Sequence, residues 1–440
     1  MMTKQLRGLG CRPSIVGCLW ALSMTTTAAL SDDWSHWRGP RRDGVSAEPS
    51  GWSPNGWLSE RPVWQAEVGA GASSPIVADD RVYVMGWQDD QDVVRCLRLG
   101  DGEEVWRRSY AAPLRGRLAT GDESFYSGPS STPEFDSRSD CLFTLSVDGE
   151  LRCWSARDGE LIWRRSLHED FPIERRDRIG RSGLRDYGMT GSPLVQGDQV
   201  IVEVGSSEGT VMAFSIRDGK HLWSSEAKEP AGHSGGPVPI VVEGVPCVAV
   251  LALRHLWVLR TEGDSAGQTV ASFEWETSFA NNIPTPAVHG QSILITTKYN
   301  HETICRIDVT LDGAERAWEQ QVASGVCSPV IHRDRVYWSS HEMFCLDWDT
   351  GDVRWRGGRF GDAGSCIATS DDRMIVWAGR GKLALVDIDP DQREYRELEQ
   401  HELGAPSDAW PHVVLADGHL LVKTREGLVR CISVLGSGSR

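Results

Sequence analysis

The sequence is short of positive charge and of long apolar runs. It contains 46 Lys and Arg against 62 Asp and Glu, a formal net charge of −16. Residues 1–31 hold three bases and no acid, so the rest of the chain carries 43 bases against 62 acids, a net charge of −19. This excess of acid argues against nucleic acid or an anionic membrane surface as the main partner. No segment approaches 18 consecutive apolar residues, so we expect no integral membrane span.

Motifs of the common enzyme classes are also missing. The sequence contains no HxH or HExxH arrangement and no P-loop. It has no CxxCH haem motif and no two adjacent cysteines, and its cysteine spacings do not resemble a metal site. The sequence therefore indicates no catalytic residue and no metal ligand.

What the sequence does contain is a repeat. Trp106, Trp163, Trp223 and Trp355 each stand ten residues after Cys96, Cys153, Ala213 and Cys345, with an Asp-Gly or Thr-Gly step between them. Such a step supplies the positive φ of a tight hairpin, and the flanking residues alternate as in half-buried strands. Degenerate copies end at Trp275, Trp318 and Tyr395. A hairpin every 40 to 60 residues is typical of a β-propeller.

The number of blades follows from a second landmark, a small residue and a proline that open each unit. These openings are Ser74-Pro75, Thr132-Pro133, Ser192-Pro193, Gly236-Pro237, Thr285-Pro286, Ser328-Pro329 and Trp410-Pro411, with an eighth, lacking proline, near Ser365-Cys366. The last unit has no final strand, but residues 61–68 resemble an outer strand with its tryptophan. We predict an all-β, eight-bladed β-propeller of four-stranded antiparallel blades, in which this N-terminal strand joins the last blade and closes the ring.

The repeat resembles the pyrroloquinoline-quinone-like (PQQ-like) repeat, and the resemblance covers roughly residues 34–434. The opening Trp37-Arg38-Gly39-Pro40 and the stretch from His168 to Phe171 are similar to those of uncharacterised bacterial PQQ-binding-like propeller proteins. The family includes quinoprotein alcohol dehydrogenases and the non-catalytic BamB-type lipoprotein of outer-membrane assembly. The resemblance therefore implies the fold and leaves the function open.

In the dehydrogenases of this family, a tryptophan and a disulfide of two adjacent cysteines sandwich PQQ. A Ca²⁺ held by Glu, Asn and Asp polarises the quinone, and an Asp acts as base. The adjacent cysteines are absent here, so we expect no cofactor and transfer no catalytic residue. PQQ with Ca²⁺ stays open as an alternative without matching motif residues.

The two ends of the sequence are set apart from the repeats. Residues 1–31 have a basic start, an apolar stretch and a small-x-small step at residues 29–31, which is typical of a secretory signal peptide. A lipobox-like step ends at Cys18, but only fourteen residues without an apolar core precede it, so we do not expect lipidation. We predict a periplasmic or extracellular protein with a signal at 1–31, a packed N-terminal segment at 32–60, a propeller at 61–434 and a flexible tail at 435–440.

Nine cysteines remain after removal of residues 1–31, an odd number. Five of them occupy one repeat position, where other copies have Ala213 or Ala384, so we expect them to fill a small buried slot. Equivalent positions in different blades should lie too far apart for disulfides. The other four, Cys141, Cys247, Cys327 and Cys366, stay open as free thiols.

The least repetitive segment, residues 164–190, indicates a binding site. It carries net positive charge on an acidic protein and joins two blades at the face where propellers gather ligands around the channel. We predict that Arg175, Arg176, Arg178 and Arg181 bind an acidic group or a partner peptide there, with internal salt bridges on a solvated loop as the alternative. On other blade-joining loops, His233 could face the channel, and Asn281 and Asn282 could bind a ligand or serve only as turn residues.

These observations favour a non-catalytic binding or assembly scaffold. We expect a monomer that recognises a protein partner or a small acidic ligand at the mouth of the channel. The alternatives are a PQQ-dependent alcohol or sugar dehydrogenase and a carbohydrate or peptide sensor. The sensor would be supported if loop tryptophans and arginines met at one pocket.

Overall fold

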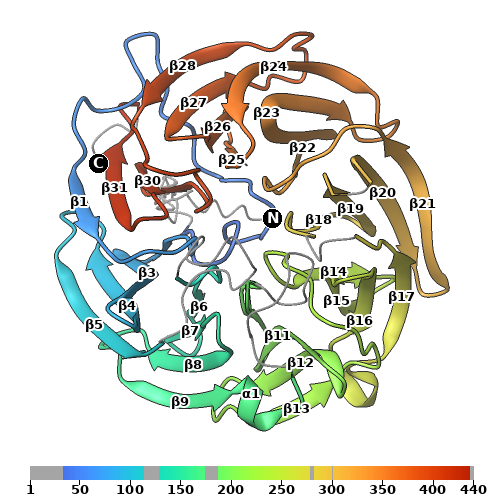
Figure 1. Cartoon of the computed structure of the whole chain (residues 1–440). Helices are drawn as coiled ribbons and strands as arrows, with labels where there is room; N and C mark the ends of the chain where they lie inside the picture. Colours follow the sequence, from blue (N-terminus) through green and yellow to red (C-terminus); the bar gives the residue numbers. More distant parts are fainter. Residues whose placement is uncertain (1–32, 113–127, 174–186, 278–281, 300, 437–440) are drawn as a thin grey trace, which may run out of the picture. The chain divides into compact units, whose positions relative to one another are not determined.

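The computed structural model describes residues 33–112, 128–173, 187–277, 282–299 and 301–436. The chain divides into two compact units, Met1–Ser31 and Asp32–Arg440, and the first lies outside the described residues. The second contains eight antiparallel sheets around a common centre, with short strands innermost and long ones at the rim (Figure 1). The predicted eight-bladed propeller is confirmed.

Each blade is one sheet, and the strands follow the chain from the centre outwards. The first four are β2 (Ile76–Ala78), β3 (Arg81–Gln88), β4 (Gln91–Arg98), β5 (Glu104–Ala111); β6 (Glu134–Asp136), β7 (Cys141–Leu145), β8 (Glu150–Ser155), β9 (Leu161–Ser166); β10 (Leu194–Gln196), β11 (Gln199–Ser206), β12 (Gly209–Ser215), β13 (His221–Ser224); and β14 (Val238–Val242), β15 (Val245–Leu251), β16 (His255–Arg260), β17 (Thr269–Glu274). The last four are β18 (Ala287–His289), β19 (Ser292–Thr297), β20 (Thr303–Thr310), β21 (Gly313–Gln320); β22 (Val330–His332), β23 (Arg335–Asp347), β24 (Val353–Gly361); β25 (Gly364–Ala368), β26 (Arg373–Ala378), β27 (Lys382–Asp387), β28 (Glu397–Glu402); and β29 (Val414–Ala416), β30 (His419–Lys423), β31 (Leu428–Ser433), β1 (Trp64–Glu67).

The eighth blade contains both ends of the propeller. Strand β1 pairs with β31 in antiparallel register, Trp64 opposite Cys431 and Glu67 opposite Leu428. The ring is thus closed by the N-terminal strand, as the sequence predicts.

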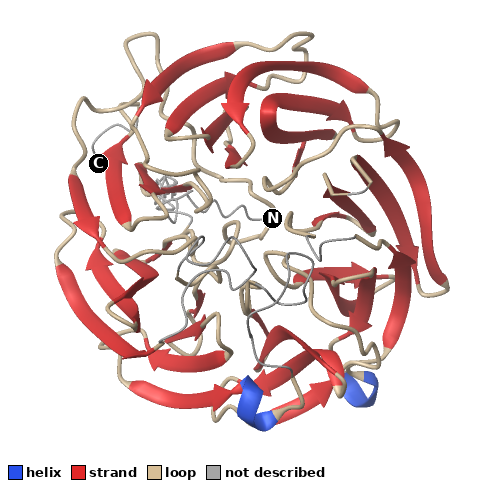
Figure 2. Ribbon diagram, in the orientation of Figure 1, coloured by secondary structure: helices blue, strands red, loops and turns tan. Residues whose placement is uncertain are grey.

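The sixth blade has three strand elements, because β23 bends back on itself. Its first part pairs with β22, and its part from His341 to Leu346 pairs with β24. His341 adopts a positive φ of 57° at the bend. The ribbon doubles back there, so this blade also consists of four chain segments (Figure 2).

The ten-residue spacing of the repeat places each cysteine or alanine opposite its tryptophan across a hairpin, as Cys96 lies opposite Trp106. The indole then packs on the turn of the next blade: a Cβ added to Gly159 would lie 2.6 Å from the Trp106 ring. The Trp106 Nε1–H donates to Ala156 O at 2.9 Å. Trp64, Trp163 and Trp318 pack in the same way on Gly102, Gly219 and Gly351. In each case the indole N–H donates to the carbonyl three residues before that glycine. The repeat therefore encodes blade-to-blade packing as well as the hairpin.

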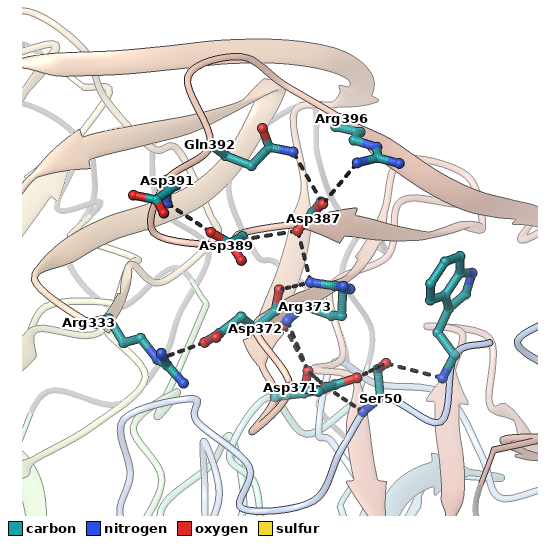
Figure 3. Close-up of polar contacts among 12 residues, drawn as sticks. Ser50, Arg333, Asp371, Asp372, Arg373, Asp387, Asp389, Asp391, Gln392 and Arg396 are labelled. Carbon is teal, nitrogen blue, oxygen red and sulfur yellow. Dashed lines mark hydrogen bonds and ion pairs between the residues drawn. The ribbon is translucent and has the colours of Figure 1, made fainter. Parts of the chain in front are cut away.

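Residues 33–58, which we call the N-terminal strap, lie against inner strands of several blades. Trp34 forms a bridge with Val77 in the first blade and Val45 one with Ala368 in the seventh. Further along, the Ser50 amide and hydroxyl donate to Asp371 at 2.8 and 2.7 Å (Figure 3). The strap thus crosses from blade to blade.

The acidic residues near Ser50 bond within the fold. Asp387 accepts a hydrogen bond from Arg373 at 2.8 Å and forms an ion pair with Arg396 at 3.5 Å (Figure 3). Asp372 forms an ion pair with Arg333 at 2.8 Å. These carboxylates are accounted for by their own protein partners.

Helix is scarce in the described part, with α1 (Leu167–Asp170) and the 3₁₀ turn η1 (Gly263–Ser265). Among these residues no helix is long and apolar enough to cross a membrane.

Candidate functional site

The openings of the blades meet around the centre of the ring through hydroxyl groups. The Ser74 N–H donates to Thr132 Oγ1 at 3.1 Å, and the Thr132 N–H donates to Ser192 Oγ at 3.0 Å. The His412 N–H donates to Ser74 Oγ at 2.7 Å. Each bond joins the opening of one blade to that of the next. The Ser or Thr before the proline at these openings is thus explained, because its short hydroxyl side chain bonds the neighbouring backbone.

The centre of the ring holds a cavity to which all eight blades contribute. Its empty volume, which includes space open to solvent, is about 770 Å³. The lining residues are Trp37, Ala72, Ser130, Tyr187, Thr190, His233, Ser234, Gly235, Ile283, Val326, Ser328, Gly364, Ser365, Trp410 and His412. Among these described residues there is no Asp, Glu, Lys or Arg. The cavity therefore combines aromatic rings with hydroxyl and imidazole groups and has no carboxylate or guanidinium on its described wall.

His412 presents an unsatisfied acceptor in this wall. Its side chain is buried, and Nδ1 lies 2.8 Å from Val413 O, so Nδ1 carries the proton and Nε2 is the bare nitrogen. Burial lowers the pKa of His412 to about 4, and the Arg38 charge lowers it further against the opposing effect of the Val413 bond. Nε2 has no hydrogen-bond partner among the described residues, and neither has the fully buried Ser234 Oγ. Buried polar groups of this kind call for an outside partner.

Trp37 brings the strap to the cavity wall. Its Nε1–H donates to Thr285 Oγ1 at 3.0 Å, and its ring meets His412 edge-on with centroids 5.3 Å apart. A Cβ at Gly235 would lie 2.7 Å from Trp37 Nε1 and 2.1 Å from Thr285 Oγ1, so only glycine fits beneath the indole. The strap therefore forms one wall of the cavity.

Beyond Trp37 the strap contains buried charge. The Arg38 guanidinium is fully buried and donates to the carbonyls of Pro286, Asp43 and Pro329. Burial lowers its pKa despite the opposing influence of Asp43, Cys366 and Cys327.

A second buried charge of the strap is paired. Arg42 binds both oxygens of Glu134 on β6, and His36 Nδ1 lies 3.2 Å from the same carboxylate. The Val195 N–H also donates to it, at 2.9 Å. Burial alone would raise the pKa of Glu134, but Arg42 and His36 outweigh it and lower the pKa to about 2.

The structure brings one of the predicted site residues to this cavity. His233 lines it and meets Tyr187 edge-on, with centroids 4.8 Å apart. Asn282 is buried beside the lining residue Ile283, and its amide donates to Ala252 O at 2.8 Å and Leu253 O at 3.3 Å. Its Oδ1 has no hydrogen-bond partner among the described residues. Arg175, Arg176, Arg178, Arg181 and Asn281 lie outside the described residues.

Sequence reasoning missed Trp37, Tyr187, Trp410 and His412 as cavity residues. A signal existed for the last two, because Trp410 and His412 are bulky where the other openings have Ser, Thr or Gly. His412 occupies the place of Ser74, two residues before the innermost strand of its blade. Trp37 gave no such signal, since it lies outside the repeats.

The family can be read from the sequence of the blades. A family profile described as outer membrane protein assembly factor BamB matches residues 89–357, more than half of the chain. The chain belongs to the BamB family. Among curated protein sequences none matches this BamB-family chain.

Solved structures show the same fold at low identity. BamB from Moraxella catarrhalis aligns with a TM-score of 0.58 and 13% identity, over 86% of this chain and 99% of that one. The quinohemoprotein alcohol dehydrogenase from Comamonas testosteroni aligns with a TM-score of 0.60 and 12% identity, over 93% of this chain and 81% of that one. A europium-containing methanol dehydrogenase aligns with a TM-score of 0.58 and 12% identity, over 89% of this chain and 90% of that one. The PQQ-like repeat propeller is therefore shown, while the choice between scaffold and oxidoreductase is not made by these likenesses.

The described wall of the cavity does not fit PQQ with Ca²⁺. Calcium prefers several oxygen ligands that include carboxylates, and the described lining contains no carboxylate. No group of three or more His, Cys, Asp or Glu among the described residues could hold a metal ion. The carboxylates of PQQ would also find no cation in the described lining. We therefore derive no redox step for this cavity.

Proposed function

We propose that this BamB-family propeller is a non-catalytic binding scaffold whose central cavity holds a neutral, hydroxyl-bearing ring, such as the terminal unit of a carbohydrate. Of the alternatives drawn from the sequence, this is the carbohydrate sensor. The observation that carries it is Nε2 of His412, which has no partner among the described residues and lies in a described wall of aromatic and hydroxyl groups without charged side chains.

The chemistry of the wall sets the class of ligand. Neutral His412 can only accept at Nε2, so it requires an O–H or N–H of the ligand. Ser234 Oγ can donate or accept beside it. A sugar ring has apolar C–H faces and a rim of hydroxyls, which match the rings of Trp37 and Trp410 and these polar atoms. A carboxylate here would lose its hydration and would meet no charged side chain in the described lining, which is costly.

The test is calorimetric titration of the protein with matched sugars. We expect galactose or N-acetylglucosamine to bind, and galacturonate, which differs from galactose by one carboxylate, to bind at least about tenfold more weakly. Tighter binding of galacturonate would favour the acidic ligand predicted from the arginine-rich loop. Binding of PQQ only with Ca²⁺ would restore the dehydrogenase. Absence of binding by every neutral sugar would overturn the proposal.

A variant pair ties binding to the cavity. Trp410→Ala should weaken binding of the neutral sugar about tenfold, since a stacked aromatic contributes about 0.5–1.5 kcal/mol beyond its buried area. Trp52→Ala is the control, because Trp52 lies in the strap beside Arg373 and does not line the cavity. Equal losses in both variants would contradict a role for the cavity.

Assembly with a protein partner is the second candidate, and the family match favours it. The outer strands of consecutive blades expose apolar side chains, which we call the outer belt: Val105 on β5, Leu161 and Ile162 on β9, and Leu222 on β13, with exposed fractions of 41–51%. Exposed apolar residues in a row suit a protein surface. A photocrosslinker at position 162 or 222 should capture a partner in cells, whereas one at Val241, 56% exposed but outside the belt, should not.

Either candidate is proposed to act outside the cytoplasm, with residues 1–31 as the export signal. Their basic start and apolar stretch support this. N-terminal sequencing of the protein recovered from a periplasmic fraction tests it, with a mature N-terminus near residue 32 expected.

A further inference from the structure

Two thiols from different blades meet beneath the cavity. Cys327 precedes the Ser328-Pro329 opening of the sixth blade, and Cys366 lies in the middle of β25 in the seventh. Their sulfur atoms are 3.6 Å apart, and both residues are buried, with exposed fractions of 1% and 0%. A disulfide requires about 2.0 Å, so the sulfurs must approach each other by about 1.6 Å. Small side-chain rotations can supply this distance.

The pair differs from four of the five cysteines in the repeat slot; the fifth, Cys153, shares a hydrogen bond with Cys141. Cys96, Cys305, Cys345 and Cys431 fill their slots as small apolar groups, and burial raises the pKa of each thiol to about 12. Such thiols stay protonated and unreactive. Cys327 has another cysteine as its neighbour and does not occupy the repeat slot.

The hydrogen bond from Cys366 and, to a smaller extent, the charge of Arg38 favour a thiolate at Cys327. The buried Arg38 acts on both thiols, and among the described residues no carboxylate forms an ion pair with it. The hydrogen bond from Cys366 lowers the pKa of Cys327 and, together with Ser339 and Arg38, outweighs burial. Cys366 is the partner that keeps its proton, since the same bond raises its pKa.

The thiols lie next to the cavity wall along the chain, and we take the cavity as the side from which a small oxidant arrives. Val326 and Ser328, on either side of Cys327, line the cavity, and so does Ser365 next to Cys366. The thiols are therefore one residue away from the cavity wall, although they are closed to large reagents.

We propose that Cys327 and Cys366 are a redox-active dithiol that a hydroperoxide converts to a disulfide between the sixth and seventh blades. The Cys327 thiolate attacks one oxygen of hydrogen peroxide, an S–O bond forms, the O–O bond breaks, and the leaving hydroxide takes up a proton to give water. The Cys366 sulfur then attacks the Cys327 sulfur, the S–S bond forms, the S–O bond breaks, and a second water leaves with the thiol proton. Two thiols are oxidised and one peroxide is reduced to two waters.

Peptide mapping tests the proposal on the purified, fully reduced protein. After brief exposure to hydrogen peroxide, the protein is alkylated in denaturant and digested with trypsin without reductant. Because each of the two cysteines falls in its own tryptic peptide, the disulfide joins peptide 317–333 to peptide 360–373. We expect this linked species in the native sample, with the peptides of Cys96 and Cys345 recovered alkylated. Free alkylated thiols at both 327 and 366, or a link from either to another cysteine, overturns the proposal.

Matched variants separate this pairing from a change of fold. Cys345→Ala is the control, because alanine occupies the same repeat position at Ala213 and Ala384, and it should form the link at the wild-type rate. Cys327→Ala and Cys366→Ala should each abolish it. If Cys327→Ala fails to fold, Cys366→Ala gives the same information, because Cys327 should then accumulate as a sulfenic acid, which dimedone labels once the oxidised protein is denatured. Equal dimedone labelling at Cys345 would contradict the special reactivity of the pair.

Discussion

The strap and the cavity meet at Trp37, yet they satisfy buried polar groups in opposite ways. On the strap side, Glu134 receives two bonds from Arg42, a contact from His36 and an amide from Val195. On the cavity side, His412 Nε2 and Ser234 Oγ have no partner among the described residues. The partners of Glu134 mark a structural contact, whereas two unpartnered atoms that lie together in one cavity wall suit a ligand.

The largest expected effect tests the paired side. Glu134→Gln should lower the free energy of unfolding by about 3–5 kcal/mol, because it leaves Arg42 buried without its counter-charge. Urea denaturation measures the change. Glu103→Gln is the control: the Arg98–Glu103 pair is exposed to solvent and should contribute little to the free energy of unfolding. Similar losses in both variants would show that the strap is not held by buried charge.

The next effect concerns the unpaired side and depends on pH. The pKa of His412 is lowered to about 4 in the folded state, so between about pH 6.5 and 4 the unfolded state binds a proton that the folded state does not. Stability should therefore fall as pH drops through this window, by about 3 kcal/mol in all. His412→Gln should remove this part of the pH dependence, measured by urea denaturation at pH 7, 5.5 and 4. His289→Gln, at a half-exposed histidine, is the control and should keep this part of the pH dependence.

A smaller effect tests the hydroxyl contacts that surround the cavity. Ser192→Ala should cost about 1–2 kcal/mol, because it leaves the buried Thr132 N–H without an acceptor. Ser215→Ala should cost only a few tenths of a kcal/mol. The Ser215 hydroxyl accepts a hydrogen bond from the Arg217 N–H, which is exposed and can bind water instead. A thermal unfolding series on both variants gives the comparison, and equal shifts would show that the central hydroxyls add no stability.

The fold was predictable because the same ten-residue pattern recurs in successive blades. Ten residues from Cys96 to Trp106 specify a hairpin, and the indole specifies its neighbour's glycine turn. Strand β1 could be assigned to the last blade because that blade lacked one strand and residues 61–68 supplied it.

The cavity was less predictable, because its distinctive residues break the repeat or lie outside it. Trp37 reaches the wall only through the path of the strap, which has no sequence period. Cys327 and Cys366 belong to different positions in successive blades, and no spacing rule indicates that their sulfurs meet. His233 was found because it lies on a blade-joining loop, and such loops gather at the centre of a propeller.

The pairing of β1 with β31 also sets the order in which the molecule can be completed. The first strand of the ring must wait for the last, because almost the whole propeller sequence lies between Trp64 and its partner Cys431. Contacts this distant in sequence form slowly, since the chain must first be ordered over a long loop. Until β31 is made, the seven earlier blades form an open arc with uncovered sheet faces at both ends, and β1 lacks its partner strand. The closing strand therefore acts as a late checkpoint, and a chain truncated before Leu428 should remain an open, aggregation-prone intermediate.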